Sequence, residues 1–128
     1  MSEIKISEYQ HQVALFQWIS AAKLSKKPNY WKLKFAHCSL SGVKLSMGQA
    51  VKIKRSGAIR GVPDVFLPIP IGSRHGLYIE MKTKGGKVSP EQNEFLEYAM
   101  EVGYVSAVCF SAKEAIDLIE KYLHGTFS

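Results

Sequence analysis

Apolar residues recur at two different spacings along this chain, and each spacing predicts a type of element. Over residues 7–23 the spacing is helical, with Ser7 at the cap position and Gln10 at the return position of a capping box. A helix is therefore expected from Ser7 to about residue 23. Its broad apolar face consists of Val13, Leu15, Phe16, Trp18, Ile19 and Ala22.

The C-terminal part of the chain predicts two more helices with a strand between them. Residues 89–92 read Ser-Pro-Glu-Gln, in which Ser89 can cap a helix, Pro90 suits its first position and Gln92 can return a hydrogen bond to the cap. Residues 104–110 form an apolar run typical of a buried strand. Residues 111–123 then have the apolar face of a closing helix.

The middle of the chain predicts strands and one short helix. Residues 31–38 alternate well enough for a strand, which a turn over residues 39–42 would end. A short basic helix follows over residues 46–56, with Ser46 as its cap. Residues 65–69 and 77–82 are two apolar strands that turn near Gly72 and Ser73. This order of elements predicts a single α/β domain, spanning residues 1–128, in which helices sandwich a mixed sheet.

Composition narrows the class of partner. With 128 residues, of which 46% are hydrophobic, the chain can bury a core, and its net charge of +6 favours a polyanionic partner, an acidic protein surface or an anionic membrane. No apolar run approaches the roughly 20 residues of a membrane span, and the start lacks the apolar segment of a signal peptide, so we expect a cytoplasmic protein. Cys38 and Cys109 lie in apolar runs, which predicts reduced core residues and no structural zinc site.

The two central strands carry the candidate chemistry. Glu80 and Lys82 are two residues apart, so they project from the same face of a strand. If the strands form an antiparallel hairpin, a turn centred on Gly72 sets Asp64 opposite Glu80, and a turn centred one residue later sets it opposite Lys82. Two neighbouring carboxylates repel each other unless a positive charge lies between them, and their hard oxygens suit Mg²⁺ or Mn²⁺. A cross-strand ion pair on a solvated face would give the same Glu-x-Lys pattern.

These residues also resemble a known family. Pro63-Asp64 followed by Glu80-Met81-Lys82 resembles the PD-(D/E)XK nuclease signature. With Gly61-Val62 before it and Ser89-Pro90-Glu91-Gln92 after it, the set resembles the VRR-NUC branch, the virus-type replication and repair nucleases, from residue 8 to about residue 123. The resemblance implies a restriction-endonuclease-like core, a central mixed β-sheet flanked by α-helices.

The resemblance also assigns roles to individual residues. It implies that Asp64, Glu80, Lys82 and Gln92 are catalytic, and that Asp64, Glu80 and the backbone carbonyl of Met81 hold Mg²⁺ or Mn²⁺. Glu8 on the first helix would complete that site or hold a second ion, and Gln12 one turn later matches a family glutamine near the DNA. From the residues alone, Glu8 is better explained as an acid favoured by the helix dipole, and capping explains Gln92 without any function. His11 has no family role and is expected at the surface.

DNA contacts are expected where basic residues are densest. The candidates are Lys52, Lys54, Arg55, Arg60, Lys84 and Lys87. A solvated helix face remains the alternative for the first three. Tyr30 and Trp31 could stack on bases or belong to the core. The segment 37–42 departs from the Asn-Gly-Gly turn of many family members, so no DNA contact is assigned to it.

The function implied by the resemblance is a metal-dependent DNA endonuclease that hydrolyses phosphodiester bonds in branched DNA. Small stand-alone domains of this branch resemble viral enzymes that resolve four-way junctions, so the resemblance favours a homodimeric Holliday-junction resolvase of phage or bacterial origin, in the cytoplasm of a bacterial cell or a phage-infected host. One set of catalytic residues in the chain would require two subunits for paired cuts. A monomeric flap or nicking nuclease within a larger repair machine is one alternative. The other is a non-catalytic DNA-binding module with the nuclease fold.

Overall fold

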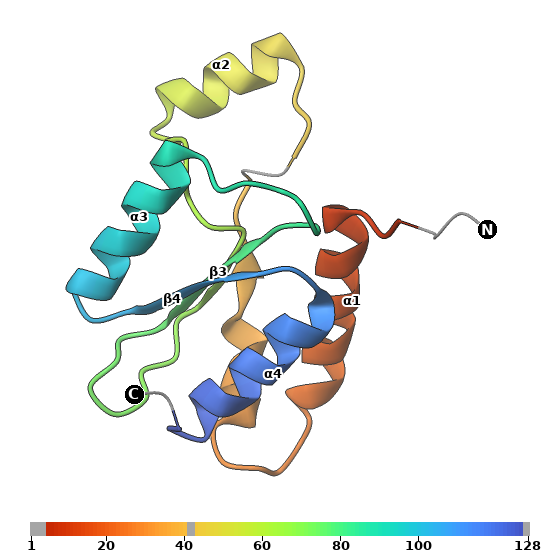
Figure 1. Ribbon diagram of the computed structural model, residues 1–128, viewed down its shortest axis with the longest axis vertical. Helices are drawn as coiled ribbons and strands as arrows, with labels where there is room; N and C mark the ends of the chain where they lie inside the picture. Colours follow the sequence, from red (N-terminus) through yellow and green to blue (C-terminus); the bar gives the residue numbers. More distant parts are fainter. Residues whose placement is uncertain (1–4, 41–42, 127–128) are drawn as a thin grey trace.

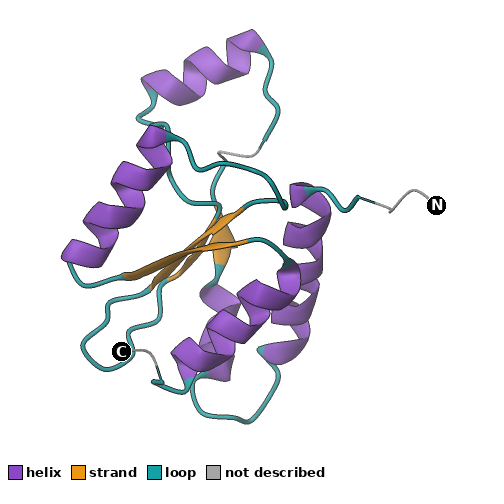
Figure 2. Ribbon diagram, viewed as in Figure 1, coloured by secondary structure: helices purple, strands orange, loops and turns teal. Residues whose placement is uncertain are grey.

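A four-stranded mixed sheet lies at the centre of the computed structural model, which describes residues 5–40 and 43–126 (Figures 1 and 2). The strands stand in the order β1-β2-β3-β4, and β3 pairs with β2 antiparallel and with β4 parallel. The antiparallel pairing of β1 with β2 completes the sheet. The strands are β1 (His37–Cys38), β2 (Val65–Leu67), β3 (Leu77–Met81) and β4 (Val105–Cys109).

Helices cover both faces of the sheet, as the predicted sandwich requires. Helices α1 (Glu8–Ala22) and α4 (Ala112–Leu123) lie together on one face, and α3 (Pro90–Glu101) lies on the other (Figure 1). Helix α2 (Met47–Arg55) projects away from the sheet at the top of the view. The predicted fold class and the order of the four α-helices are thus confirmed.

Alternation along β3 divides the interior into two parts. Leu77, Ile79 and Met81 are at most 1% exposed and join Leu15 and Ile19 of α1 in the main core. Since successive side chains of a strand point to opposite faces, this core lies on the side of α1 and α4. On the other side Tyr78 stacks on Phe66, with ring centroids 4.3 Å apart, and meets Phe95 of α3 edge-on.

Three helices begin with the same capping box, two of which the sequence predicted in full. Ser7 and Gln10 form it at α1, Ser46 and Gln49 at α2, and Ser89 and Gln92 at α3. In each case the Ser hydroxyl accepts from the Gln backbone and the Gln side chain accepts from the Ser backbone, which satisfies two amide groups that the helix itself cannot.

The predicted strand over residues 31–38 is wrong in most of its length. Residues Tyr30–Phe35 form a 3-10 helix, η1, and only His37 and Cys38 pair with β2. Trp31, Leu33 and Phe35 alternate with lysines as in a strand, but the buried residues are Tyr30 and Leu33, which are three residues apart in a segment that contacts α1. That spacing repeats on one side of a 3-10 helix.

Two smaller predictions also have an outcome, and a third extends beyond the described residues. Cys109 is buried as predicted, but Cys38 is exposed, because β1 is a two-residue strand at the edge of the sheet. His11 is half-buried, and its Nδ1 accepts a hydrogen bond of 3.1 Å from the N–H of Ala112, so the prediction of a surface histidine is wrong. The predicted turn over residues 39–42 extends into residues 41–42, outside the described residues.

None of the helices in the described ranges is both long and apolar enough to cross a membrane.

Candidate active site

The hairpin of β2 and β3 brings the two predicted carboxylates together. Its ladder pairs Val65 with Ile79 and Leu67 with Leu77, so the next pair in register is Asp64 with Glu80. This is one of the two registers that the sequence allowed, and both side chains are buried, Asp64 at 8% and Glu80 at 1% exposure.

The tip of the hairpin does not set this register. Ile71 and Arg74 exchange two backbone hydrogen bonds of 3.0 and 2.9 Å around Gly72 and Ser73, with Gly72 at φ 57°. Extended down the hairpin, that pairing would place Asp64 opposite Met81 rather than Glu80. The pairing therefore slips by one residue across residues 68–70, where two prolines lack the N–H that a ladder needs.

Glu80 is contacted on one oxygen and bare on the other. Its Oε2 accepts a hydrogen bond of 3.0 Å from Nε2 of Gln92 and lies 3.5 Å from Nζ of Lys82. Its Oε1 is buried, and within the described part of the chain it has no hydrogen-bond partner. Three of the predicted catalytic residues thus meet at one carboxylate, and the second oxygen of that carboxylate has no hydrogen bond from the described residues.

Asp64 is fixed by the backbone of the neighbouring strand. Its Oδ2 accepts a hydrogen bond of 2.7 Å from the N–H of Met81. A short bond between a carboxylate and an amide holds the side chain in one orientation. The Met81 side chain lies in the core, so this residue takes part in the site only through its backbone.

The pKa of Glu80 is raised to about 8, first by burial and then by the negative charge of Asp64, although Lys82 lowers it. The pair therefore retains a proton at neutral pH when no cation is present. A divalent cation would neutralise both carboxylates and occupy the bare oxygen, and oxygen ligands are those that Mg²⁺ and Mn²⁺ prefer. The residues present fit such an ion, with Asp64, Glu80 and the Met81 carbonyl as its predicted ligands.

The first helix contributes less directly. Glu8 is exposed on the first turn of α1, a helix that contacts β3, and Gln12 one turn later is half-buried. In the ranges that the structure describes, no group of three His, Cys, Asp or Glu residues is placed to hold a metal ion. A role for Glu8 as a third ligand thus stays a prediction.

The Gly61-Val62-Pro63-Asp64 segment is held against the start of α3. Gly61 has φ 88°, and a Cβ there would lie 2.6 Å from the carbonyl carbon and oxygen of Glu91 and 2.9 Å from the nitrogen of Gln92. Only glycine fits so close a backbone approach at a positive φ. This contact joins the strand that carries Asp64 to the helix that carries Gln92, and the sequence motif gave no indication of it.

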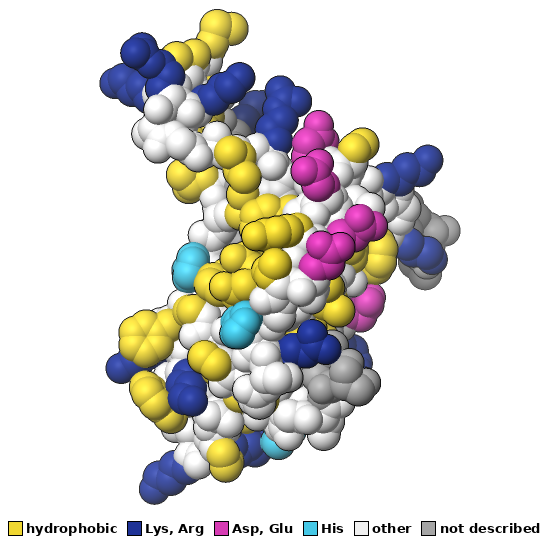
Figure 3. All heavy atoms as spheres, turned by 90° about the vertical axis from the view of Figure 1, so that its left-hand side faces the viewer, with side chains coloured by type: hydrophobic (Ala, Val, Ile, Leu, Met, Phe, Trp, Pro, Cys, Tyr) yellow, Lys and Arg dark blue, Asp and Glu magenta, His cyan; other side chains and the backbone are white. Residues whose placement is uncertain are grey.

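The predicted DNA-contacting residues lie outside this buried cluster. Figure 3 shows Lys and Arg side chains gathered over α2 at the top of the molecule, with acidic side chains below them. All six of the basic candidates are exposed: Lys52, Lys54, Arg55, Arg60, Lys84 and Lys87. Their exposure suits contact with phosphates, and nothing in the fold assigns them that contact.

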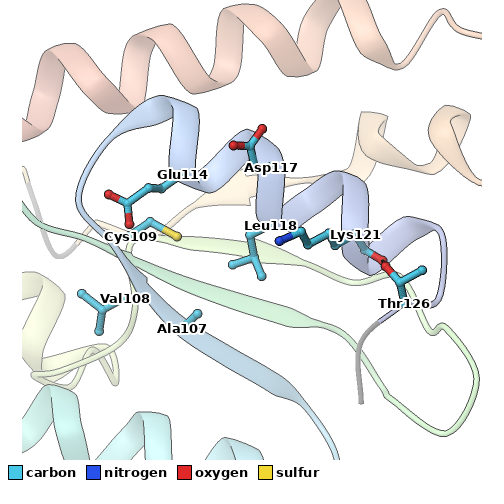
Figure 4. A pocket seen from close by; sticks show the side chains of 8 residues that line it. All are labelled: Ala107, Val108, Cys109, Glu114, Asp117, Leu118, Lys121 and Thr126. Carbon is cyan, nitrogen blue, oxygen red and sulfur yellow. The ribbon is translucent and has the colours of Figure 1, made fainter.

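A hollow of about 510 Å³ between β4 and α4 belongs to a different part of the molecule (Figure 4). Cys109, Glu114 and Lys121 are among its lining residues, and none of the predicted catalytic residues lines it. Burial raises the pKa of the Cys109 thiol to about 12, with a smaller effect of Glu114, which keeps this thiol protonated at neutral pH.

Comparisons with known proteins bear on the fold and on the family. The family model of the VRR-NUC domain matches residues 6–113. A solved structure, a VRR_NUC domain protein, is 27% identical to this chain over 94% of this chain and 91% of its own length, with a TM-score of 0.73. The comparison with curated proteins finds no match.

Proposed function

This chain belongs to the VRR-NUC domain family, whose members are nucleases, and on that basis we propose that it is a metal-dependent DNA endonuclease. The observation that carries this proposal is the buried pair of Asp64 and Glu80, in which Glu80 contacts Lys82 and Gln92 and keeps one oxygen bare. A buried acidic pair of this kind destabilises a fold unless a ligand uses it, which favours a catalytic role over a structural one.

The predicted metal site consists of Asp64, Glu80 and the carbonyl of Met81, with Glu8 as a further ligand. A bound Mg²⁺ or Mn²⁺ would supply Lewis-acid activation of water and neutralise charge on the phosphate. The hydrogen bond from Met81 orients Asp64, and Gln92 orients Glu80. Both carboxylates are thereby preorganised, so little reorganisation is needed when the charge of the reaction develops.

Lys82 is the residue that we assign to the attacking water. Its Nζ lies 3.5 Å from Glu80, with the side chain 13% exposed, so its positive charge stands at the edge of the buried cluster. There it orients the water and favours the loss of a proton from it. Attack on the phosphorus then leaves a 5′-phosphate and a 3′-hydroxyl, as the family resemblance implies.

The substrate that we propose is branched DNA, cut by a homodimeric Holliday-junction resolvase of phage or bacterial origin that acts in the cytoplasm. One domain, residues 1–128, provides one set of catalytic residues, so symmetric cuts in two strands require two copies of the chain. Phosphates would be contacted by the exposed basic residues of α2, by Arg60 and by the loop after β3. Contacts of this kind recognise the shape of the DNA rather than its base sequence.

The test compares cleavage of matched four-way junction, flap and linear duplex DNA, with Mg²⁺ or Mn²⁺, by the wild-type chain and by Lys82→Ala. We expect symmetric paired cuts in the junction, reduced about 10²–10³-fold in the variant, with DNA binding nearly unchanged. Cuts mainly in the flap or duplex would refute the resolvase and retain the nuclease. No cleavage of any substrate would instead support the non-catalytic binding module, and sedimentation distinguishes the dimer from a monomeric nuclease.

A further inference from the structure

The basic residues of this chain are segregated along the sequence. Residues 9–63 contain ten Lys and Arg and no Asp or Glu, whereas nine of the 11 acidic residues lie at position 64 or later. This acid-free stretch includes α2 and also η1, which the proposed DNA contacts leave out. Since both are basic, η1 is a second candidate for contact with a polyanion.

The 3-10 helix η1 presents two aromatic rings with lysines beside them. Trp31 and Phe35 are each 54% exposed. Nζ of Lys34 lies 5.6 Å from the centroid of the Trp31 ring and 5.1 Å from that of Phe35, and Nζ of Lys32 lies 5.9 Å from Trp31. We refer to Trp31, Lys32, Lys34 and Phe35 as the Trp31 patch.

The patch is held firmly from below. Tyr30 and Leu33, on the opposite side of η1, are 3% and 1% exposed and belong to the main core. Burial of these two residues fixes the orientation of the short helix, so the exposed rings are presented to solvent on a rigid support. A ligand that stacks on the rings would therefore lose little affinity to ordering of the protein.

We propose that the Trp31 patch binds unpaired DNA, with bases stacked on Trp31 and Phe35 and phosphates held by Lys32 and Lys34. Every base has a π-face that can stack on an aromatic ring, and a nucleic acid strand offers one phosphate per base. The aromatic rings and lysine ammonium groups of the Trp31 patch therefore match the bases and phosphates of such a strand. A lipid bilayer is a poorer fit, because the lysines interrupt the apolar surface that would enter it.

The patch lies at the end of the sheet away from the catalytic carboxylates. The N–H of Ser39 donates to the backbone oxygen of Asp64, and β1 runs antiparallel to β2 from there. Phe35 is four residues before Ser39, about 13 Å along an extended chain. A stacked strand covers that length with about four nucleotides. The choice of DNA as the ligand of the patch rests on the proposed function.

Trp31 itself reports the binding. In a Trp18→Phe variant it is the sole tryptophan, because the chain has two. With EDTA present to prevent cleavage, we expect saturable quenching of its fluorescence by an oligothymidylate of about 12 nucleotides, within the usual site sizes of about 4–16. In the same background, Phe35→Ala and the pair Lys32→Gln with Lys34→Gln should each weaken binding about tenfold. Tyr98→Ala is the matched control, because Tyr98 is 62% exposed on the acidic helix α3.

Three results would contradict binding of unpaired DNA by the Trp31 patch. Absence of quenching, or an affinity that Phe35→Ala leaves unchanged, would overturn the proposal, and so would quenching by phosphatidylserine-containing vesicles but not by the oligonucleotide. Junction cleavage with Mg²⁺ is measured on the same variants. Normal cleavage without quenching would refute DNA binding by the Trp31 patch and support the nuclease. Quenching in a protein that cuts no DNA would support binding by the patch and refute the proposed function.

Discussion

Helices α2 and α3 begin in the same way and lie in different environments. Both start with a Ser-x-x-Gln capping box in which the two reciprocal hydrogen bonds are formed. In α3, Leu96 and Ala99 are buried against the sheet, and the backbone oxygen of Leu96 accepts a 2.7 Å hydrogen bond from the Ser106 hydroxyl of β4. In α2, no residue is buried. The capping box therefore specifies where a helix begins but does not determine how the helix packs.

The same difference separates the two capping glutamines. Gln49 uses its side-chain oxygen to cap α2, and Gln92 does the same for α3. Because α3 starts beside β3, the amide nitrogen of Gln92 is also able to donate to Glu80. One end of the Gln92 side chain thus caps α3 and the other end contacts Glu80, and the position of the helix decides whether this second contact forms.

The largest expected effect tests how α3 is held in that position. Gly61→Ala would place a Cβ 2.6 Å from the backbone of Glu91, so we expect a loss of about 3 kcal/mol or more in the free energy of unfolding, measured with urea. Gly57→Ala is the matched control, because Gly57 also has a positive φ but open space around it. It should lose only about 1 kcal/mol through backbone strain. Equal losses would show that the contact with α3 is unimportant.

Much of the fold, and the shared face of Glu80 and Lys82, could be predicted because those signals were local. The period of two on β3 separated Glu80 and Lys82 from the core residues, and the capping boxes located the helix starts. The hairpin register could not be chosen, because the pairing slips between its tip and its ladder. The 3-10 helix η1 and the contact of His11 with α4 depend on packing between distant segments, which no local pattern specifies.

The next effect concerns the carboxylate that Gln92 contacts. In the folded protein the pKa of Glu80 is about 8, against an ordinary value of 4.5. The stability that the protonated form contributes is full below pH 4.5 and is lost as pH rises to about 8. In EDTA, the free energy of unfolding should therefore fall by a few kcal/mol across that range. Glu80→Gln should flatten the profile, and Glu94→Gln, on the exposed side of α3, should leave it unchanged.

Divalent ions should reverse that loss at the upper end of the range. A cation bound by Asp64 and Glu80 favours the ionised pair, so addition of Mg²⁺ or Mn²⁺ at pH 8 should raise the unfolding free energy of the wild-type chain. Glu80→Gln should show a much smaller gain. A profile that is flat in EDTA, or a gain that Glu80→Gln retains in full, would contradict the assignment of this pair as the metal site.

The two glutamines give the direct test of the comparison. Gln92→Ala should reduce DNA cleavage about 10–100-fold, because Glu80 loses the residue that orients it. Gln49→Ala should leave cleavage unchanged. Both variants lose a capping bond, so both should lose about 0.5–1 kcal/mol of stability, measured by thermal unfolding. If both variants cut DNA equally well, Gln92 is a cap and no more.

The smallest effect concerns the exposed helix. Replacement of Lys52, Lys54 and Arg55 by Gln removes three charges from a helix without buried residues, so the fold should be unaffected. Affinity for junction DNA should fall about threefold to tenfold, and the slope of its logarithm against that of salt concentration should decrease by about 2–3, about one for each phosphate that the variant no longer neutralises. Lys113→Gln with Lys121→Gln on α4 is the control for general loss of charge. An unchanged slope would mean that α2 touches no DNA. The exposure of this helix would then need an explanation other than DNA binding.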